Sequence, residues 1–417
     1  MESSHTNKRK IINDPVFGFI SLQSEIIFDL IEHSYFQRLR RIRQLGLSSL
    51  VYPGANHTRF EHALGALHLM HSSIDVLRSK GVDISDEEAN AVSIAILLHD
   101  IGHGPFSHVL ESAIVNGINH EKLSLLLMEQ LNVEFGGKLD LAICIFKNKY
   151  SKKFLHQLVS SQLDMDRLDY LRRDSFYSGV VEGTIGSDRI IKMLNVKDDN
   201  LVVDKKAIYS IEKFLIARRL MYWQVYLHKT VLAAEYVLIN VLKRAKELVS
   251  RGVDLYGPPQ LLWLLKQNFS DESLKIADNK SSLIEKFVLL DDADILSSLK
   301  VWCTHSDPIL SFMSNSIVNR KLFKIRISDK HFSPETIGHY NNAAMARFEI
   351  NKIDLPYFVF SGEITNSFYE SESENIFILF NNGRKADLRD ASDIDLAALS
   401  KRVKKHFLCY PKELDIK

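Results

Sequence analysis

The chain has 417 residues, enough for about two or three structural units with buried cores. Hydrophobic residues make up 46% and charged residues 25%, as in soluble globular proteins, which excludes a disordered or fibrous chain. The 53 Lys and Arg residues balance 52 Asp and Glu residues, so bulk charge does not indicate nucleic acid or an anionic membrane as a partner.

Cysteine usage and the start of the chain favour a cytoplasmic protein. Cys144, Cys303 and Cys409 are too widely spaced to form a disulfide framework or a CxxC metal motif. Residues 1–10 are polar and basic, unlike a signal peptide, and we expect a flexible tail there. The apolar runs are shorter than the roughly 20 residues that cross a bilayer, so we expect no membrane partner.

Apolar residues recur at intervals of three and four from Ser24 to about Leu242, which predicts a helical domain. Asp86 is expected to cap a helix that ends after His99, where a Gly- and Pro-rich segment follows. We expect helices over residues 24–43, 62–78, 86–99, 121–131, 139–146, 160–174 and 208–250, and a small hairpin strand over 201–203.

After about Asn319 the pattern changes to short strands. We expect strands over residues 322–327, 357–364 and 375–380, a hairpin turn over 381–383 and a helix over 392–406. The sequence therefore predicts a mainly α protein, with a helical domain over residues 11–317 and a smaller C-terminal α+β lobe over residues 318–417.

Residues of the types that bind metals gather in four segments, over residues 57–62, 99–108, 119–121 and 164–170. An isolated histidine is more often a packed or surface residue than a ligand. The adjacent pair His99 and Asp100 differs, because it follows the apolar run 95–98 and precedes a glycine turn. A carboxylate at the buried end of a core helix needs a compensating partner, and a metal ion is one such partner.

The order His62, His99–Asp100, Asp166 resembles the H…HD…D signature of the HD phosphohydrolase superfamily. The segments 12–18, 37–46, 52–62, 99–108 and 166–170 resemble more specifically the deoxynucleoside triphosphate (dNTP) triphosphohydrolases. That family includes bacterial enzymes and the catalytic core of an animal enzyme with an added SAM domain, which we do not expect here. The resemblance covers roughly residues 11–300 and implies an HD-domain helical core.

By this resemblance four side chains would bind a divalent metal ion: His62, His99, Asp100 and Asp166. Two imidazoles and two carboxylates suit Mn, Fe, Zn, Ni or Mg, so the identity of the metal stays open. We expect Mg²⁺ on the substrate phosphates as well. At 100° per residue, His68 and His71 lie about 120° and 180° from His62 on their helix, so we predict that neither is a ligand.

Counted from Asp166, the side chains of Tyr170, Asp174 and Arg167 fall at about 40°, 80° and 100° around their helix, so they share one face. Asp169 and Arg173 are expected to form a solvated i,i+4 pair. The resemblance implies that Arg167 contacts the substrate phosphates. Tyr170 and Asp174 would line the sugar, and Asp174 would take the 3′-hydroxyl.

The resemblance implies further substrate contacts. Arg59 and Arg218 would bind phosphates, whereas Gln44 and Leu45 would meet the deoxyribose. Tyr226 would stand against the sugar and exclude a 2′-hydroxyl, although it could instead be one more aromatic residue of the core.

Four residues resemble the catalytic and phosphate-facing group of the family: His103, His108, Glu111 and His120. Of these, His103 and His120 are expected to move protons, because the pKa of an imidazole lies near neutrality. The basic run 38–43 is interpreted as the charged outer face of a packed helix, with nucleotide or oligomer contacts as the alternative.

The implied reaction is metal-dependent attack of water on the α-phosphorus of a dNTP, which releases a deoxynucleoside and triphosphate. A different HD-type nucleotide phosphatase or phosphodiesterase is the first alternative, because it would share the metal site. A non-catalytic nucleotide-binding regulator is the second. The resemblance also implies a homo-oligomer (dimer or tetramer) and a regulatory nucleotide, for which Lys229 is the one recognisable residue.

Overall fold

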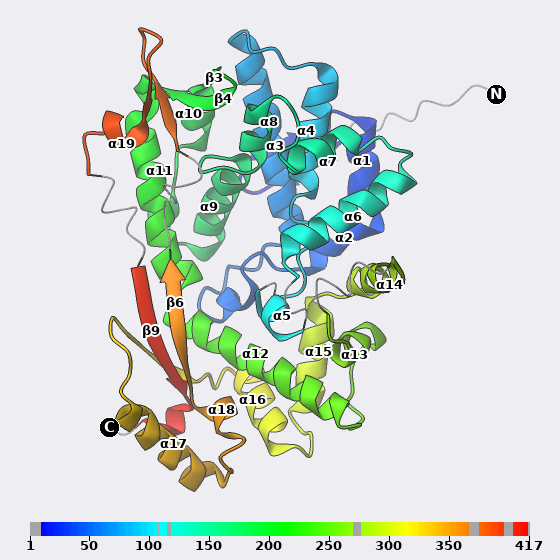
Figure 1. Ribbon diagram of the computed structural model, residues 1–417, viewed down its shortest axis with the longest axis vertical. Coiled ribbons are helices and arrows are strands. Elements are labelled where there is room, and N and C mark those ends of the chain that lie inside the picture. The colour runs from blue at the N-terminus through cyan, green and yellow to red at the C-terminus, as the bar shows by residue number, and fades with distance from the viewer. Residues whose placement is uncertain are drawn as a thin grey trace, which may run out of the picture.

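The computed structural model describes residues 10–106, 108–114, 118–269, 277–366, 375–395 and 403–415. Helices predominate among them, which confirms the predicted mainly α fold (Figure 1). The helices of the first half are α1 (Glu25–Glu32), α2 (Ser34–Gln37), α3 (Arg59–Ser79), α4 (Asp86–Leu98), α5 (His108–Ala113), α6 (His120–Glu134), α7 (Asp140–Phe146), α8 (Lys153–Val159), α9 (Met165–Ser178) and α10 (Ser187–Lys192). Those of the second half are α11 (Ile208–Met221), α12 (Lys229–Ser250), α13 (Pro259–Lys266), α14 (Ala277–Phe287), α15 (Asp292–Trp302), α16 (Pro308–Val318), α17 (Pro334–Phe348), α18 (Leu355–Phe358) and α19 (Leu388–Ala391).

Two predicted helices are broken in the structure. The segment 24–43 divides at His33, whose extended backbone separates α1 from α2, and continues as a 3-10 turn over Arg38–Arg41. The segment 208–250 divides after a π-helical turn over Tyr222–Tyr226, and the two parts meet at an angle of 55°. His228 begins the second part, because its side chain accepts a hydrogen bond from Thr230 N.

Short strands form three small sheets. The strands are β1 (Ile11–Asp14), β2 (Gly18–Ser21), β3 (Leu194–Lys197), β4 (Asn200–Asp204), β5 (Lys324–Ser328), β6 (Phe360–Asn366), β7 (Phe377–Leu379), β8 (Lys385–Asp387) and β9 (Val403–Tyr410). The hairpin β1–β2 is separate, β9 lies between β5 and β6 in an antiparallel sheet, and the third sheet has the order β3-β4-β7-β8.

The predicted helix over residues 392–406 is wrong where the structure describes it. Residues 403–406 begin strand β9, which lies between β5 and β6 and pairs with both. Residues 392–395 are irregular. Residues 396–402 lie outside the described part of the chain. A helix was predicted because the apolar residues of 394–407 recur at a helical spacing. Pairing with the neighbouring strands favours the extended form instead.

The C-terminal residues pack in two places. Strands β5, β6 and β9 lie beside α12 at one end of the molecule, whereas the hairpin β7–β8 extends the sheet of β3 and β4 at the other (Figure 1). One continuous apolar core, which includes Leu67, Leu238 and Leu408, runs through both regions. We propose the division into a helical domain over residues 11–317 and a lobe over 318–417, with β7–β8 as the part of the lobe that returns to the domain.

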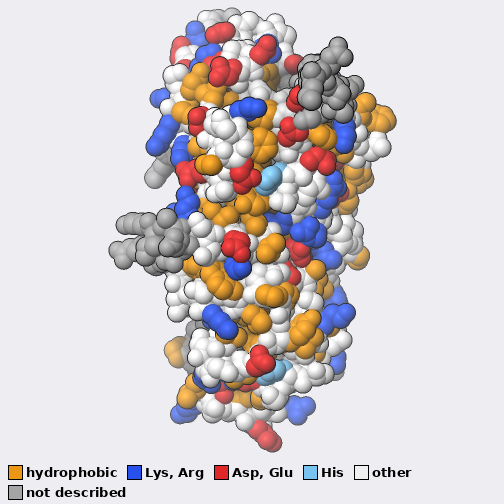
Figure 2. All heavy atoms as spheres, turned by 90° about the vertical axis from the view of Figure 1, so that its right-hand side faces the viewer, with side chains coloured by type: hydrophobic (Ala, Val, Ile, Leu, Met, Phe, Trp, Pro, Cys, Tyr) orange, Lys and Arg blue, Asp and Glu red, His pale blue; other side chains and the backbone are white. Residues whose placement is uncertain are grey.

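On the face shown in Figure 2, acidic and basic side chains are interspersed along the length of the molecule. In the described ranges, no single helix has the length and apolar composition needed to cross a bilayer, although residues 205–226 and 229–250 would meet that criterion as a bent pair.

Candidate active site and metal centre

His62 is held in the first turn of α3. The helix begins after Thr58, where Glu61 Oε2 accepts a hydrogen bond from Thr58 N at 2.6 Å and Oε1 accepts one from the Tyr177 hydroxyl. His62 is completely buried, and its Nδ1 lies 2.7 Å from Asp169 Oδ2. This hydrogen bond fixes the ring and directs Nε2 toward the site.

His99 and Asp100 end the buried helix α4. The helix is capped by Ser85, and not by Asp86 as predicted, since the Ser85 side chain accepts a hydrogen bond from Glu88 N. His99 Nδ1 lies 2.6 Å from the carbonyl of Ile96, which leaves Nε2 available. Gly102 is required in the following turn, because a Cβ there would lie 2.1 Å from Ser124 N of α6.

Asp166 lies in the first turn of α9. That helix starts at Met165, later than predicted, because Asp164 caps it by accepting hydrogen bonds from Ser161 N and Arg167 N. Helices α3 and α9 approach closely at Gly65, where a Cβ would lie 1.9 Å from Asp169 Oδ1. The close approach brings the first turns of the two helices together.

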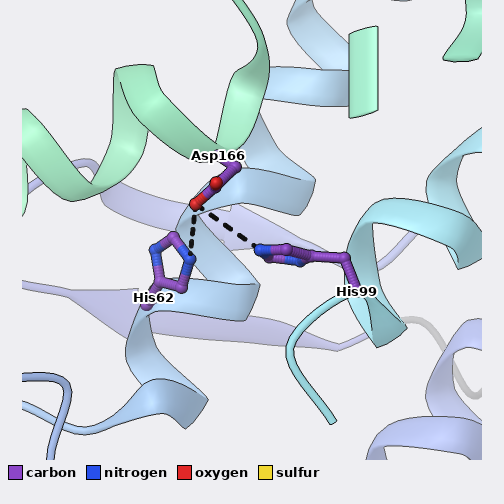
Figure 3. Close-up of side chains that lie close together, drawn as sticks. All are labelled: His62, His99 and Asp166. Carbon is purple, nitrogen blue, oxygen red and sulfur yellow. Dashed lines mark ion pairs between the residues drawn. The ribbon is translucent and has the colours of Figure 1, made fainter. Parts of the chain in front are cut away.

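The structure brings the four predicted metal ligands together. Figure 3 shows the Asp166 carboxylate directed at the rings of His62 and His99, with Oδ1 at 3.1 Å and 3.5 Å from their Nε2 atoms. Asp100 places Oδ2 3.7 Å from His62 Nε2 and Oδ1 3.4 Å from His99 Nε2. Three of these residues form a group whose ligand atoms lie within 4.8 Å of one another: His62, His99 and Asp166.

Several buried atoms at the site lack hydrogen bonds that a ligand could supply. Among the described residues, ten buried side-chain N or O atoms make no hydrogen bond, and six of them belong to this region. They are Gln44 Oε1, His57 Nδ1, Arg59 Nε, His62 Nε2, His99 Nε2 and Arg218 Nε. Because unsatisfied buried polar atoms are rare, their concentration here fits a charged and polar ligand.

The electrostatics of the site favour a positive charge between the carboxylates. Burial disfavours a charged imidazole, but Asp166 and Asp169 outweigh that effect and raise the pKa of His62 to about 10. Burial also opposes ionisation of Asp166, yet His62 and His99 hold its pKa below the ordinary range. A proton or a divalent cation can supply this charge, and two imidazoles with two carboxylates are a donor set that fits the cation.

Asp169 and Arg173 form the predicted i,i+4 pair, but the prediction that this pair is solvated is wrong. The two side chains pair with Nη2 to Oδ1 at 3.0 Å, but both are completely buried. Arg173 Nη1 also donates to Asp14 Oδ2 at 2.8 Å, and Asp169 contacts His62. The pair therefore orients His62 through Nδ1, on the side of the ring opposite the candidate metal site.

His103 and His120 stack with ring centroids 3.9 Å apart. His120 Nδ1 lies 3.0 Å from Glu111 Oε1, and His103 Nε2 lies 3.2 Å from Asp100 Oδ1. Burial lowers the pKa of His103 to about 3, well below the near-neutral value on which its predicted proton-transfer role was based. His108 begins α5, but its side chain lies outside the part of the chain that the structure describes.

A second cluster forms at the other end of α9, around Asp174. The Tyr226 hydroxyl donates to Asp174 Oδ2 at 2.7 Å, and His57 Nε2 lies 2.8 Å from Oδ1. Burial and the neighbouring carboxylate raise the pKa of Tyr226, so the phenol remains a donor. Tyr170 adds an edge-on contact, with its ring centroid 6.1 Å from that of Tyr226.

The backbone of Gln44 lies beside that of His57, because residues 42–44 run antiparallel to 57–59. Gln44 N donates to the His57 carbonyl at 3.0 Å, and Leu45 follows at the start of the next turn. His57 is a site residue that was not predicted from the sequence. The available signal was its position in the segment 52–62, which also supplies His62. In the structure His57 binds the same carboxylate as Tyr226.

Of the three arginines predicted to bind phosphate, Arg59 and Arg218 are buried and Arg167 is partly exposed. Arg59 Nη1 donates to Asp100 Oδ2 at 2.5 Å, Arg167 Nε donates to the Ser161 carbonyl at 2.6 Å, and Arg218 Nη1 donates to Gln162 Oε1 at 2.9 Å. Each retains further N–H groups. They belong to α3, α9 and α11, and Arg59 contacts the ligand cluster directly through Asp100.

The interpretation of the basic run 38–43 as an outer face is wrong for Arg38. This side chain is completely buried, and it donates to the carbonyls of Ile101, His103 and Leu290 at 2.8 to 3.2 Å. Burial lowers its pKa to about 9. Arg38 thus holds the turn that follows His99 and Asp100.

His68 and His71 contact other parts of the molecule. The His68 ring lies 5.3 Å from that of Phe17, and His71 lines a cavity of about 390 Å³ between α1, α3 and α4. Burial lowers the pKa of His71 to about 4, so this side chain is neutral near pH 7.

Comparisons with known proteins identify the family. The model of the HD domain matches residues 59–173, and that of an HD associated region matches residues 185–254. The chain is 33% identical over 429 residues to YwfO of Bacillus subtilis (strain 168), which covers 98% of this chain and 93% of that protein. It also resembles the crystal structure of a phosphohydrolase from Bacteroides thetaiotaomicron VPI-5482, with a TM-score of 0.93 and 53% identity over 96% of this chain and 99% of the other. The chain belongs to the HD phosphohydrolase family.

A further relative within the HD phosphohydrolases is named for its activity. The chain is 30% identical over 304 residues to the deoxynucleoside triphosphate triphosphohydrolase SAMHD1 homolog of Dictyostelium discoideum. The match covers 68% of this chain and 58% of that protein, so the chain spans little more than half the length of this relative. The HD-domain match contains the four converging residues His62, His99, Asp100 and Asp166, whereas Arg218 and Tyr226 fall in the HD associated region.

Proposed function

We propose that the protein hydrolyses dNTPs to a deoxynucleoside and inorganic triphosphate in a metal-dependent reaction. The observation that carries the proposal is the pair of clusters at the two ends of one face of α9. Asp166 faces the imidazoles of His62 and His99, and Asp174 lies two turns away, roughly 12 Å along the helix axis, between His57 and Tyr226. The cluster at Asp166 suits the phosphate chain of a nucleotide, and the cluster at Asp174 suits its sugar.

His62, His99, Asp100 and Asp166 would hold the divalent cation. When bound, it would supply positive charge to a phosphate oxygen and acidify a water molecule, whichever of Mn, Fe, Zn, Ni or Mg it is. The guanidinium groups of Arg59, Arg167 and Arg218 would bind the phosphate oxygens, since guanidinium donates two parallel hydrogen bonds to such groups. We expect Mg²⁺ to accompany the substrate phosphates.

Gln44, Leu45 and Tyr170 would line the sugar, and Asp174 would accept a hydrogen bond from the 3′-hydroxyl. The ring of Tyr226 packs against Tyr170 and would leave no room for a 2′-hydroxyl, and its hydroxyl donates to Asp174. This arrangement favours a dNTP triphosphohydrolase over an HD-type nucleotide phosphatase or phosphodiesterase, which would need no discrimination at the sugar. The stacked histidines beside the cation site favour an enzyme over a non-catalytic regulator.

A homo-oligomer (dimer or tetramer), a regulatory nucleotide near Lys229 and a cytoplasmic location belong to the same proposal. The resemblance to the family supports the first two. The free cysteines Cys144, Cys303 and Cys409 support the third.

The test is incubation of the purified protein with each dNTP and NTP in the presence of Mn²⁺ or Mg²⁺. We expect triphosphate as the phosphate product and a higher kcat/KM for each dNTP than for the matching NTP. Orthophosphate or pyrophosphate would favour the first alternative, and binding without turnover would favour the regulator. Equal rates with dGTP and GTP would contradict the sugar assignment.

Variants of Tyr226 sharpen this test. Tyr226→Ala should reduce the preference for dNTP over NTP, because the cavity left by the ring admits a 2′-hydroxyl. Tyr226→Phe is the matched control: it retains the ring and removes only the hydrogen bond to Asp174, so the preference should persist while overall activity falls.

His120→Ala is expected to lower kcat by roughly 10² or more, the scale of a lost general acid or base, with metal content unchanged. Glu111 holds the Nδ1 side of the ring, so Nε2 is the atom that would exchange a proton with substrate or water. Steady-state kinetics and metal analysis of the same preparation separate the two effects. Unaltered turnover in this variant would remove His120 from the mechanism.

A further inference from the structure

A second group of metal-binding side chains lies in the C-terminal sheet, which packs on α12. His331, Glu363 and His406 each place one ligand atom within 4.8 Å of the others. His406 is on the central strand β9, directly opposite Glu363 on β6 in the antiparallel register. On its other side His406 pairs with Ser328 of β5, and the chain leaving β5 carries His331 back over it.

The three side chains lie slightly farther apart than the ligands of a bound metal ion. The rings of His331 and His406 have centroids 3.7 Å apart with an interplanar angle of 31°, and Glu363 Oε1 lies 3.6 Å from His406 Nδ1. Ligand atoms about 2.0 to 2.2 Å from one zinc ion in tetrahedral geometry lie roughly 3.3 Å apart. His331 and Glu363 are exposed, so side-chain rotation at the surface can close the remaining distance, whereas His406 is buried and fixed by the sheet.

The charged side chains around this group and its own ligand types determine which metal ions it can bind. Lys404 Nζ pairs with Glu363 Oε2 at 2.7 Å, which lowers the pKa of this carboxyl and leaves Oε1 facing His406. Lys405 lies on the same strand, 3.9 Å from Asp329. Two imidazoles and one carboxylate select a transition metal of intermediate softness over Mg²⁺ or Ca²⁺, which prefer sites made of oxygen.

We propose that His331, Glu363 and His406 form a second metal site, specific for Zn²⁺, Ni²⁺ or Cu²⁺ and separate from the HD centre. Water would complete the coordination on the exposed side. Bound metal ties the segment after β5 to strands β6 and β9, and so stabilises the sheet. This site does not depend on the proposed reaction, because none of its residues belongs to the HD centre.

The experiment measures Zn²⁺ binding to the full-length protein by calorimetry, in an Asp166→Ala background that weakens the HD centre. We expect one site per chain whose Zn²⁺ affinity falls at least tenfold on adding His331→Ala, whether or not the separate group His103, Glu111 and His120 also binds Zn²⁺. The matched control is His339→Ala, an exposed histidine on α17, which should leave the affinity unchanged. Equal Zn²⁺ affinity in the His331 and His339 variants would overturn the proposal.

Two further measurements test the composition of the site. Cu²⁺ bound to the Asp166→Ala protein should show electron paramagnetic resonance couplings from two imidazole nitrogens, reduced to one by His331→Ala. Lys404→Ala should raise Zn²⁺ affinity, because it removes a positive charge beside Glu363, whereas Glu363→Gln should lower it. Couplings that do not change in the His331 variant would contradict the assignment, whatever the outcome of the dNTP assay.

Discussion

Asp166→Ala is expected to remove tight metal binding and phosphohydrolase activity together. Asp166 Oδ1 is the oxygen that faces both His62 Nε2 and His99 Nε2, so its loss leaves two imidazoles without the carboxylate between them (Figure 3). Loss of residues that only orient a metal ligand already costs 10- to 100-fold in affinity or activity, and we expect more than about 10²-fold here. Metal content by mass spectrometry and turnover of dNTPs measure the two effects.

Asp188→Ala is the control for that experiment, because Asp188 is a carboxylate at the protein surface whose one described ion pair is with Arg172. It should retain both metal and activity. If Asp166→Ala keeps normal metal content but loses turnover, the carboxylate acts on the substrate and the assignment of the metal ligands is wrong.

Arg173→Met is expected to lower the free energy of unfolding by about 3 to 5 kcal/mol, the cost of leaving a buried charge without its partner. The guanidinium of Arg173 contacts the buried carboxylates of Asp14 and Asp169, and methionine fills similar space without donating to either. The variant should also bind metal more weakly, since Asp169 holds His62 Nδ1. Denaturant titration and metal binding measure the two losses.

Arg172→Met, one residue earlier on α9, provides the comparison. Arg172 is partly exposed; it pairs with Asp188 at the surface and donates to Ser187 Oγ and the Val16 carbonyl, so we expect a clearly smaller loss than in Arg173→Met. Similar losses in the two variants would show that the buried network contributes nothing beyond an ordinary surface pair.

The convergence of His62, His99, Asp100 and Asp166 was predictable because these residues occupy short, ordered motifs whose chemistry is explicit in the sequence. His99 and Asp100 follow an apolar run, and this run forms the buried part of helix α4. The surroundings of the centre were less predictable. An i,i+4 pair such as Asp169 and Arg173 has the same spacing on a solvated face as in a core, and only the packing of α3 against α9 at Gly65 decides between them.

Other differences arise from contacts between residues far apart in the chain. Arg38 is buried because the carbonyls of residues 101, 103 and 290 converge on it, which no local pattern reports. The break at His228 follows a π-helical turn, where periodicity continues although the backbone changes direction. The extended form of residues 403–406 depends on pairing with β5 and β6, which are supplied by segments tens of residues earlier.

The parallel pairing of β4 with β7 has a consequence for synthesis on the ribosome. Val202 pairs with Phe377, about 175 residues later in the chain. At 5 to 20 residues per second, β7 emerges roughly 10 to 35 s after β4. For that interval the nascent chain presents an uncovered strand edge while helices α11 to α18 are still being made, and such edges are where unfinished chains associate. A chaperone that delays this association would therefore act on residues 200–204, and its release would coincide with the arrival of residues 377–379.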